Sequence, residues 1–210
     1  MLKIAVASHA DAWKRKAIRM AMDDRLFKQR SEMINGVTIM MSPRPVVNPN
    51  KIIVNLSILF GVYLKGKRCI NLSDGVDVHL DEQNRVVPDS MIICNRDIIK
   101  RDGVYGAPDL IVEVLSPSTA RRDRGDKKIL YEQHGVQEYW IISPDEKSVE
   151  VYLLKDGKYE LDDVYTVIPD GDWEEMTEEE KSEVALNLKV SLYDDFIINV
   201  KDVFENVITY

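Results

Sequence analysis

The most informative side chain in this 210-residue sequence is the carboxylate of Glu113. It lies inside the run LIVEVL at 110–115, which is otherwise apolar. Such a run predicts a strand covered on both faces, and strand alternation puts Asp109, Ile111, Glu113 and Leu115 on one face. An unpaired ionised carboxylate there costs on the order of several kcal/mol. We therefore predict that Glu113 is a metal ligand, with a salt bridge to a buried arginine or lysine as the alternative.

Asp89 is the natural partner of Glu113, because it opens the short apolar strand predicted within 88–95. The Pro-Asp pair is a weak signal alone, since the chain has four of them and such pairs are common in turns. The strand MIIC that follows Asp89 and the strand that carries Glu113 set this pair apart. Two carboxylates on neighbouring strands suit Mg²⁺ (or Mn²⁺), which prefers hard oxygen ligands.

Positive charge for phosphodiester chemistry is available on the helix predicted within 116–135. A cation beside the metal stabilises the negative charge that develops on the phosphate. Lys127 shares its helical stripe with Leu130 and Tyr131, whereas Lys128 is rotated by about 100° and shares its stripe with Glu132. We predict that Lys127 points inward as the catalytic lysine. The alternative is a surface ion pair with Asp123 at the i,i+4 spacing.

The same helix begins with the basic run RRDRGDKK at 121–128, which has five basic and two acidic residues. This run is the candidate DNA-contacting surface, although a solvated face is the alternative. The candidate substrate-binding residues are Ser116, Arg121, Arg122, Arg124 and Lys128.

Several further elements are predicted from periodicity and turn signals. Asn35-Gly36 predicts a hairpin, 50–64 a helix that faces the core, and 68–80 strands broken near Asp74-Gly75. The loop 100–108 precedes the Glu113 strand, and strands are expected at 136–143, 148–154 and 189–192. Helices are expected at 11–29 and 199–207. This order predicts an α/β (α+β) protein with a mixed central sheet flanked by helices.

The composition is that of a globular protein, with 45% hydrophobic and 30% charged residues. The formal net charge is −8, but the stretch 170–183 carries −7 of it, so the remaining chain is close to neutral. We interpret the acidic stretch as a surface excursion. Cys69 and Cys94 lie in apolar runs, so we expect them to be buried and reduced. No signal peptide or long apolar run is evident, which favours a cytoplasmic protein with no membrane partner.

The segment 107–154 resembles the core signature of the Uma-two family, also called DUF820. The similarity rests on the strand followed by SPST, on Asp-x-x-x-Lys in the helix, and on the motif GVQEYW at 135–140. Weaker similarity extends over roughly 30–165. The family is restriction-endonuclease-like and belongs to the PD-(D/E)XK nuclease superfamily. The resemblance implies a magnesium-dependent endonuclease that acts on DNA, and a homodimer, because two symmetric sites can cut both strands.

The resemblance also assigns roles to individual positions. Asp89 and Glu113 match the two metal-binding carboxylates, and the main-chain carbonyl of Val114 would be a further ligand. Glu32 matches an acidic residue that could complete the metal site. Leu115 stands where the superfamily has its lysine, and Lys127 matches the helix lysine that replaces it.

The sequence departs from the family pattern after the SPRP turn, where many members carry a histidine and this chain has Pro49 or Asn50. This departure keeps a second hypothesis open, a DNA-binding module that retains the nuclease fold without catalysis. A purely structural or protein-interaction domain would leave Glu113 unexplained. The expected organisation is an N-terminal helical extension (1–30), a nuclease-like core (31–165), and an acidic excursion with a C-terminal strand and helix (166–210).

Overall fold

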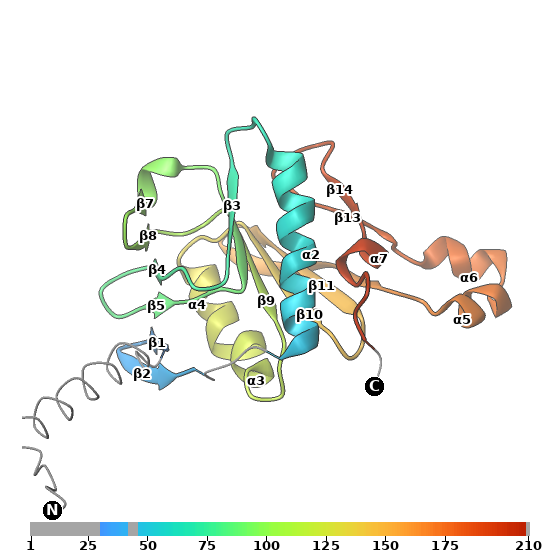
Figure 1. Ribbon diagram of the computed structural model, residues 1–210, viewed down its shortest axis with the longest axis horizontal. Helices are drawn as coiled ribbons and strands as arrows, with labels where there is room; N and C mark the ends of the chain where they lie inside the picture. Colours follow the sequence, from blue (N-terminus) through green and yellow to red (C-terminus); the bar gives the residue numbers. More distant parts are fainter. Residues whose placement is uncertain (1–29, 42–45, 209–210) are drawn as a thin grey trace, which may run out of the picture.

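The computed structural model describes residues 30–41 and 46–208, and it has a mixed α+β architecture (Figure 1). The helix predicted at 11–29 lies outside the described residues, as does the predicted extension except for Arg30. The elements in chain order are β1 (Ser31–Ile34), β2 (Val37–Met40), α2 (Val47–Leu64), β3 (Ile70–Ser73), β4 (Val78–His79), β5 (Arg85–Val86), β6 (Ser90–Ile93), η1 (Arg96–Ile98), β7 (Ile99–Lys100), β8 (Gly103–Tyr105), β9 (Leu110–Val114), α3 (Ala120–Arg122), η2 (Asp123–Lys127), α4 (Lys128–Gln133), β10 (Glu138–Ser143), β11 (Ser148–Lys155), β12 (Lys158–Thr166), α5 (Asp170–Glu175), α6 (Glu178–Glu183), β13 (Asn187–Lys189), β14 (Ile197–Asn199) and α7 (Val200–Val203).

The main sheet has the order β12-β11-β10-β9-β6-β3, so β9 lies near its centre. β9 runs parallel to β10 and antiparallel to β6. Leu110, Val112 and Val114 belong to the cluster that packs under α2. Ile111 and Leu115 belong to the cluster on the opposite face, under α4. The main sheet is therefore covered on both faces, as the apolar run of β9 predicts.

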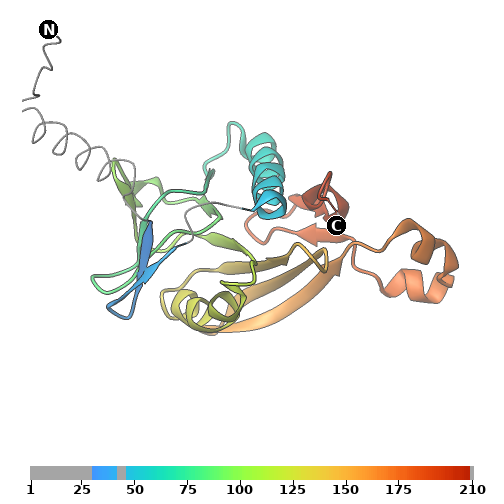
Figure 2. The same ribbon diagram turned by 60° about the horizontal axis from the view of Figure 1, so that its bottom comes forward.

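A side sheet with the order β2-β1-β5-β4-β8-β7 stands at the edge of this body (Figures 1 and 2). Its first hairpin turns at Asn35 and Gly36, whose φ angles of 52° and 75° lie in the left-handed region. This confirms the turn predicted from the Asn-Gly pair. Ile34 and Val86 join the α4-side cluster of the main sheet, so the side sheet packs on the same face as α4.

Two expectations need correction at the level of single elements. The segment 100–108 was expected as a loop, but it contains β8 and the end of β7, which pair as a hairpin. The strand expected at 189–192 lies earlier, as β13, and pairs with β14. The acidic stretch lies at the surface, as expected, where it forms two short helices, α5 and α6, which project from the body and bury none of their residues (Figure 2).

Helix α2 spans 18 residues and is long and apolar enough, by length and composition, to cross a membrane. Core helices pass the same test, and α2 has a buried face that contacts the main sheet. Ile52, Leu56 and Phe60 lie on that face with no exposed surface. The Asn55 side chain donates hydrogen bonds to the carbonyls of Val203 and Glu205 and so ties α2 to the C-terminal segment.

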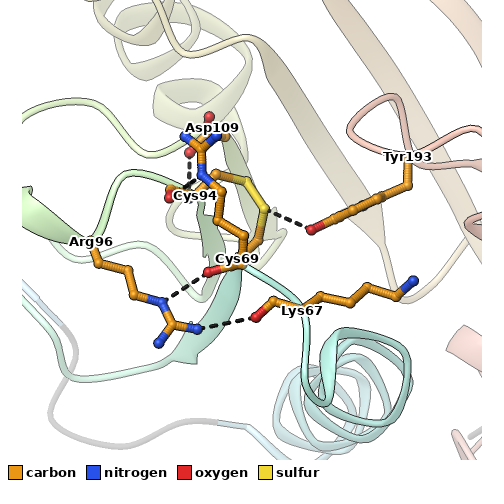
Figure 3. The surroundings of a disulfide bond; sticks show 7 residues. Lys67, Cys69, Cys94, Arg96, Asp109 and Tyr193 are labelled. Carbon is orange, nitrogen blue, oxygen red and sulfur yellow. Dashed lines mark hydrogen bonds between the residues drawn. A yellow bond between two sulfur atoms is a disulfide. The ribbon is translucent and has the colours of Figure 1, made fainter.

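The prediction of reduced cysteines is wrong in this structure, because Cys69 and Cys94 form a disulfide (Figure 3). The reason is register: β3 pairs antiparallel to β6 with Ile70 opposite Ile93, so the two cysteines occupy the next opposed positions. The Cys94 N–H donates to an Asp109 carboxylate oxygen at 2.7 Å, and the Tyr193 hydroxyl contacts Cys69 Sγ at 3.1 Å. Sequence spacing alone gave no indication of this pairing.

We expect the disulfide to stabilise the fold, because it joins residues separated by 25 positions and so restricts the unfolded chain. A loop of this length corresponds to about 3 kcal/mol and to a melting temperature higher by on the order of 10 °C. Thermal unfolding with and without a thiol reductant measures the effect. The variant Cys94→Ala should melt near the reduced wild-type temperature and ignore the reductant. A wild-type melting temperature that the reductant leaves unchanged would contradict the disulfide's contribution.

Candidate active site between the two sheets

The site is built around Glu113 on β9, which faces the helical segment α3–α4. Glu113 is only 3% exposed, and the whole of β9 is buried. Its oxygen Oε1 accepts hydrogen bonds from the ammonium of Lys127 at 2.9 Å and from the hydroxyl of Tyr131 at 2.6 Å. The alternative of a buried salt bridge is thus realised, and a further carboxylate lies next to it.

That second carboxylate is Asp89, which immediately precedes β6. Its oxygen Oδ2 accepts the main-chain N–H of Val114 at 2.7 Å. In an extended strand the N–H and C=O of one residue point to the same side, so the Val114 carbonyl is directed toward Asp89 as well. Asp89, Glu113 and the Val114 carbonyl therefore lie together at the C-terminal end of β9. These are the groups that the sequence predicts as metal ligands.

The Lys127 side chain reaches the same end of β9 from the helical segment, as the prediction of an inward-pointing lysine requires. Its ammonium lies 2.7 Å from Glu32 Oε1, 2.9 Å from Glu113 Oε1 and 3.8 Å from Asp123 Oδ1. The pair with Asp123 does form, but it is buried rather than a surface pair, because both residues are at most 3% exposed. The segment η2 that contains both is a π-helical turn, a feature often found at functional sites.

Glu32 comes from β1 of the side sheet and is 1% exposed. Besides Lys127, its Oε1 accepts the Val87 N–H at 3.1 Å, and its Oε2 accepts from Arg122 at 3.3 Å. Both oxygens are thus engaged by protein groups. The role of Glu32 as a metal ligand stays a prediction, and its contacts show how it holds Lys127 in place.

The electrostatics of this cluster indicate a shortage of positive charge. Four carboxylates (Glu32, Asp89, Glu113 and Asp123) face two cations, Arg122 and Lys127. Burial raises the pKa of Asp89 to about 6, and burial also raises the pKa of Glu113 well above its usual range. Burial lowers the pKa of Lys127, but the attraction of Glu113, Glu32 and Asp123 outweighs this and raises it overall. Lys127 is therefore a fixed cation.

With all four carboxylates ionised, a divalent cation would offset the two negative charges that Arg122 and Lys127 leave unbalanced, and the donors are the hard oxygens that Mg²⁺ prefers. One oxygen of the buried Asp123 carboxylate, Oδ1, has no hydrogen-bond partner, in keeping with this charge excess. Within residues 30–41 and 46–208, no three histidine, cysteine, aspartate or glutamate side chains already surround one point as metal ligands. The residues that fit a metal are thus two carboxylates, Asp89 and Glu113, supplemented by a main-chain oxygen.

These groups line a cavity of about 580 Å³. Its floor holds Glu32, Asp89, Glu113 and Lys127. The lining also includes the hydroxyl-rich segment 116–119 with Arg122, the ion pair of Arg30 and Asp74, and an apolar wall. The apolar wall includes Met40, Met41, Val46, Pro49, Ile53 and Val87. The arrangement combines an acidic, metal-type floor with groups that can hydrogen-bond a phosphate.

Comparison with known proteins bears on this arrangement. The family model Uma2, described as "Putative restriction endonuclease", matches residues 21–189. The chain belongs to the Uma2 family. An uncharacterized protein of Synechocystis is 34% identical over 128 residues, which cover 60% of this chain and 60% of that relative. A crystal structure of a "putative nuclease belonging to DUF820" from Anabaena variabilis superposes with a TM-score of 0.63 at 23% identity, over 84% of this chain and 90% of that one. These matches confirm the resemblance and the restriction-endonuclease-like fold.

The predicted substrate-binding residues of this Uma2 protein divide into two groups. Ser116 and Arg122 line the cavity. Arg124 instead pairs with Glu150 at 2.6 Å, and the Lys128 ammonium lies 3.5 Å from the centre of the Tyr152 ring. Arg121 is exposed on α3 and does not line the cavity. The structure thus assembles part of the basic run at the site and directs the rest elsewhere.

Two further residues, Pro49 and Tyr131, contribute to the site of this Uma2 protein. Of the two residues that stand where the family resemblance places a histidine, Pro49 lines the cavity and Asn50 is exposed. The sequence assigns Tyr131 only to the helical stripe of Lys127, whereas in the structure the Tyr131 hydroxyl also donates a hydrogen bond to Glu113. Its i+4 spacing from Lys127 was the available signal.

We expect metal binding by this Uma2 protein to strengthen as pH rises through about 6. The folded-state pKa of Asp89 is raised from 3.8 to about 6, because burial outweighs the Val114 hydrogen bond. A raised carboxyl pKa means that the metal-free fold loses stability as pH rises from about 4 to 6. Above that window the ionised Asp89 can bind a cation, and below it a proton competes.

The measurement is the melting temperature at several pH values, with and without Mg²⁺ at about 10 mM, a concentration that should saturate a weak site. The rise caused by Mg²⁺ should be a few degrees above pH 7 and close to zero at pH 5. An equal rise at both pH values would exclude Asp89 as the titrating ligand.

Proposed function

We propose that this chain is a metal-dependent endonuclease that hydrolyses DNA phosphodiester bonds, with Mg²⁺ (or Mn²⁺) held by Asp89, Glu113 and the Val114 carbonyl. The observation that carries the proposal is the buried Glu113, which is held against Lys127 at the floor of a cavity next to Asp89. Buried carboxylates with raised pKa values that line a cavity are typical of functional sites. Membership of the Uma2 family supports the same reaction class.

Each residue has a defined task in this proposal. A bound Mg²⁺ would act as a Lewis acid toward the phosphate and lower the pKa of the attacking water. Lys127 stays protonated between Glu32 and Glu113, so it stabilises developing phosphate charge and cannot accept the proton from water. Ser116 and Arg122 on the cavity wall would orient the phosphate.

The second candidate is a DNA-binding module that has kept the fold without catalysis. The residues Pro49 and Asn50, which stand where the family resemblance places a histidine, favour this candidate. A cleavage assay on single-stranded, duplex and branched DNA, with Mg²⁺, Mn²⁺ and EDTA, separates the two. The endonuclease predicts metal-dependent products. Binding of DNA without products under every metal condition would support the inactive module.

We further propose that the protein acts as a homodimer, because two symmetric sites can cut both strands of a duplex. The support is mechanistic and comes from the reaction rather than from a contact surface. Light scattering at tens of micromolar protein, with and without a short duplex, measures the mass. A monomer under both conditions would argue against the dimer.

A further inference from the structure

We propose that Tyr131 is a positioning residue that fixes the Glu113 carboxylate for metal binding. The inference rests on the proposed function, because it concerns the same metal site. It goes further by assigning a task to a residue that touches neither the metal nor the cavity. Tyr131 is not among the cavity-lining residues and has no exposed surface.

The geometry divides the two oxygens of Glu113. Oε1 accepts from the Tyr131 hydroxyl at 2.6 Å and from the Lys127 ammonium at 2.9 Å. Within the described part of the chain, no hydrogen bond to Oε2 is present. Two donors from one helix thus occupy the same oxygen and leave the other for a cation at the cavity. A carboxylate held by a single donor would retain freedom to rotate about its terminal bond.

The Tyr131 ring is fixed by its packing in the core, so its hydroxyl can hold the Glu113 carboxylate in one orientation. Its ring packs edge-on to the ring of Tyr139 with centroids 5.1 Å apart, and both rings are completely buried. It follows Lys127 by four residues, so both donors stand on one side of the helix. Hydrogen bonds behind a ligating carboxylate typically change metal affinity or activity by 10–100-fold.

Tyr139 on β10 provides a matched control. It is equally buried, and its hydroxyl donates to a main-chain carbonyl, that of Asp123, at 3.0 Å. The substitutions Tyr131→Phe and Tyr139→Phe each remove one buried hydroxyl and one hydrogen bond of similar cost, about 1 kcal/mol. Only Tyr131→Phe removes a bond to a predicted metal ligand. Both variants should therefore lose similar thermal stability in EDTA.

The experiment measures Mg²⁺ and Mn²⁺ binding by calorimetry and the metal concentration for half-maximal cleavage. We expect Tyr131→Phe to raise both the dissociation constant and the half-maximal concentration by about 10-fold or more, while kcat at saturating metal changes little. Tyr139→Phe should bind metal within about twofold of wild type, and Tyr131→Phe should have no further effect in a Glu113→Gln background.

The outcomes are distinguishable. If wild type binds metal and Tyr131→Phe binds it equally well, the inference about Tyr131 is overturned while the proposed function stands. An equal loss in Tyr139→Phe would make the effect a general one of core packing and would also overturn it. If wild type binds no metal, the proposed function itself fails and the inference with it.

Discussion

Lys127→Ala is expected to reduce DNA cleavage by about 10²-fold or more, because it removes the fixed cation beside the scissile phosphate. A surface ion pair with Asp123, the alternative that the sequence offered, would leave the melting temperature nearly unchanged. The structure alters that expectation, since the ammonium is buried between Glu32 and Glu113. Leaving these carboxylates without their partner costs about 3–5 kcal/mol. We therefore expect a lower melting temperature in EDTA together with the loss of cleavage.

Lys128→Ala is the matched control for this prediction. It removes the adjacent lysine, whose ammonium lies over the ring of Tyr152, away from the cavity. Cleavage by Lys128→Ala should be close to that of wild type, measured as single-turnover rates at saturating metal. If Lys127→Ala cuts DNA as fast as wild type, the helix-lysine mechanism is wrong. Lys127 would then be a counter-ion that stabilises the buried carboxylates and nothing more.

Glu113→Gln is expected to abolish measurable metal binding and to lower cleavage by about 10³-fold. The reason is that a bound metal contributes several kcal/mol to the transition state, and the neutral amide of glutamine lacks the negative charge with which a carboxylate holds Mg²⁺. The stability of the metal-free Glu113→Gln variant should not fall together with its activity. Burial raises the pKa of Glu113, so its ionised form is unfavourable in the metal-free fold. A neutral side chain of the same shape avoids that cost, and Lys127 keeps Glu32 and Asp123 as partners. The melting temperature in EDTA should be unchanged or higher.

Glu138→Gln supplies the control, because Glu138 is a second buried glutamate on the neighbouring strand β10. Its carboxylate binds the Trp140 indole N–H and the Ser191 N–H and hydroxyl, and it does not line the cavity. Calorimetric titration with Mg²⁺ should show wild-type binding for Glu138→Gln. Equal binding by wild type, Glu113→Gln and the more severe Glu113→Ala would remove Glu113 from the metal site.

The parts of the structure that sequence predicted well are those whose signals are local. The Asn35-Gly36 turn follows from backbone conformation, and β9 follows from an apolar run that only a doubly covered strand can bury. Lys127 follows from helical periodicity, because Leu130 on the same stripe must face the core. The parts that were missed depend on pairing between distant segments. Strands of two or three residues, such as β5 and β7, are too short to show a period.

The parts of the site that the sequence did not predict also depend on contacts between segments far apart in the chain. The contact between Glu32 and Lys127 joins residues 95 positions apart and depends on how the side sheet packs beside α4. Glu32 was identified by resemblance alone, since nothing in its local sequence distinguishes it. The cysteine pair followed from strand register, which a single sequence specifies only weakly. Asp123 was expected as a partner of Lys127, but its burial depended on the packing of the helix.

The π-helical turn η2 makes the site sensitive to the number of residues between Asp123 and Lys127. A π-turn closes its hydrogen bonds from i to i+5, one residue more than an α-turn. Deleting the loosely packed Gly125, which has open space around it, would let the turn revert to α-helix. Leu130 and Tyr131 would keep their contacts with the main sheet, whereas Arg122 and Asp123 would rotate by about 100° relative to them. A deletion at this turn is therefore expected to break the Arg122–Glu32 contact even though neither residue is substituted.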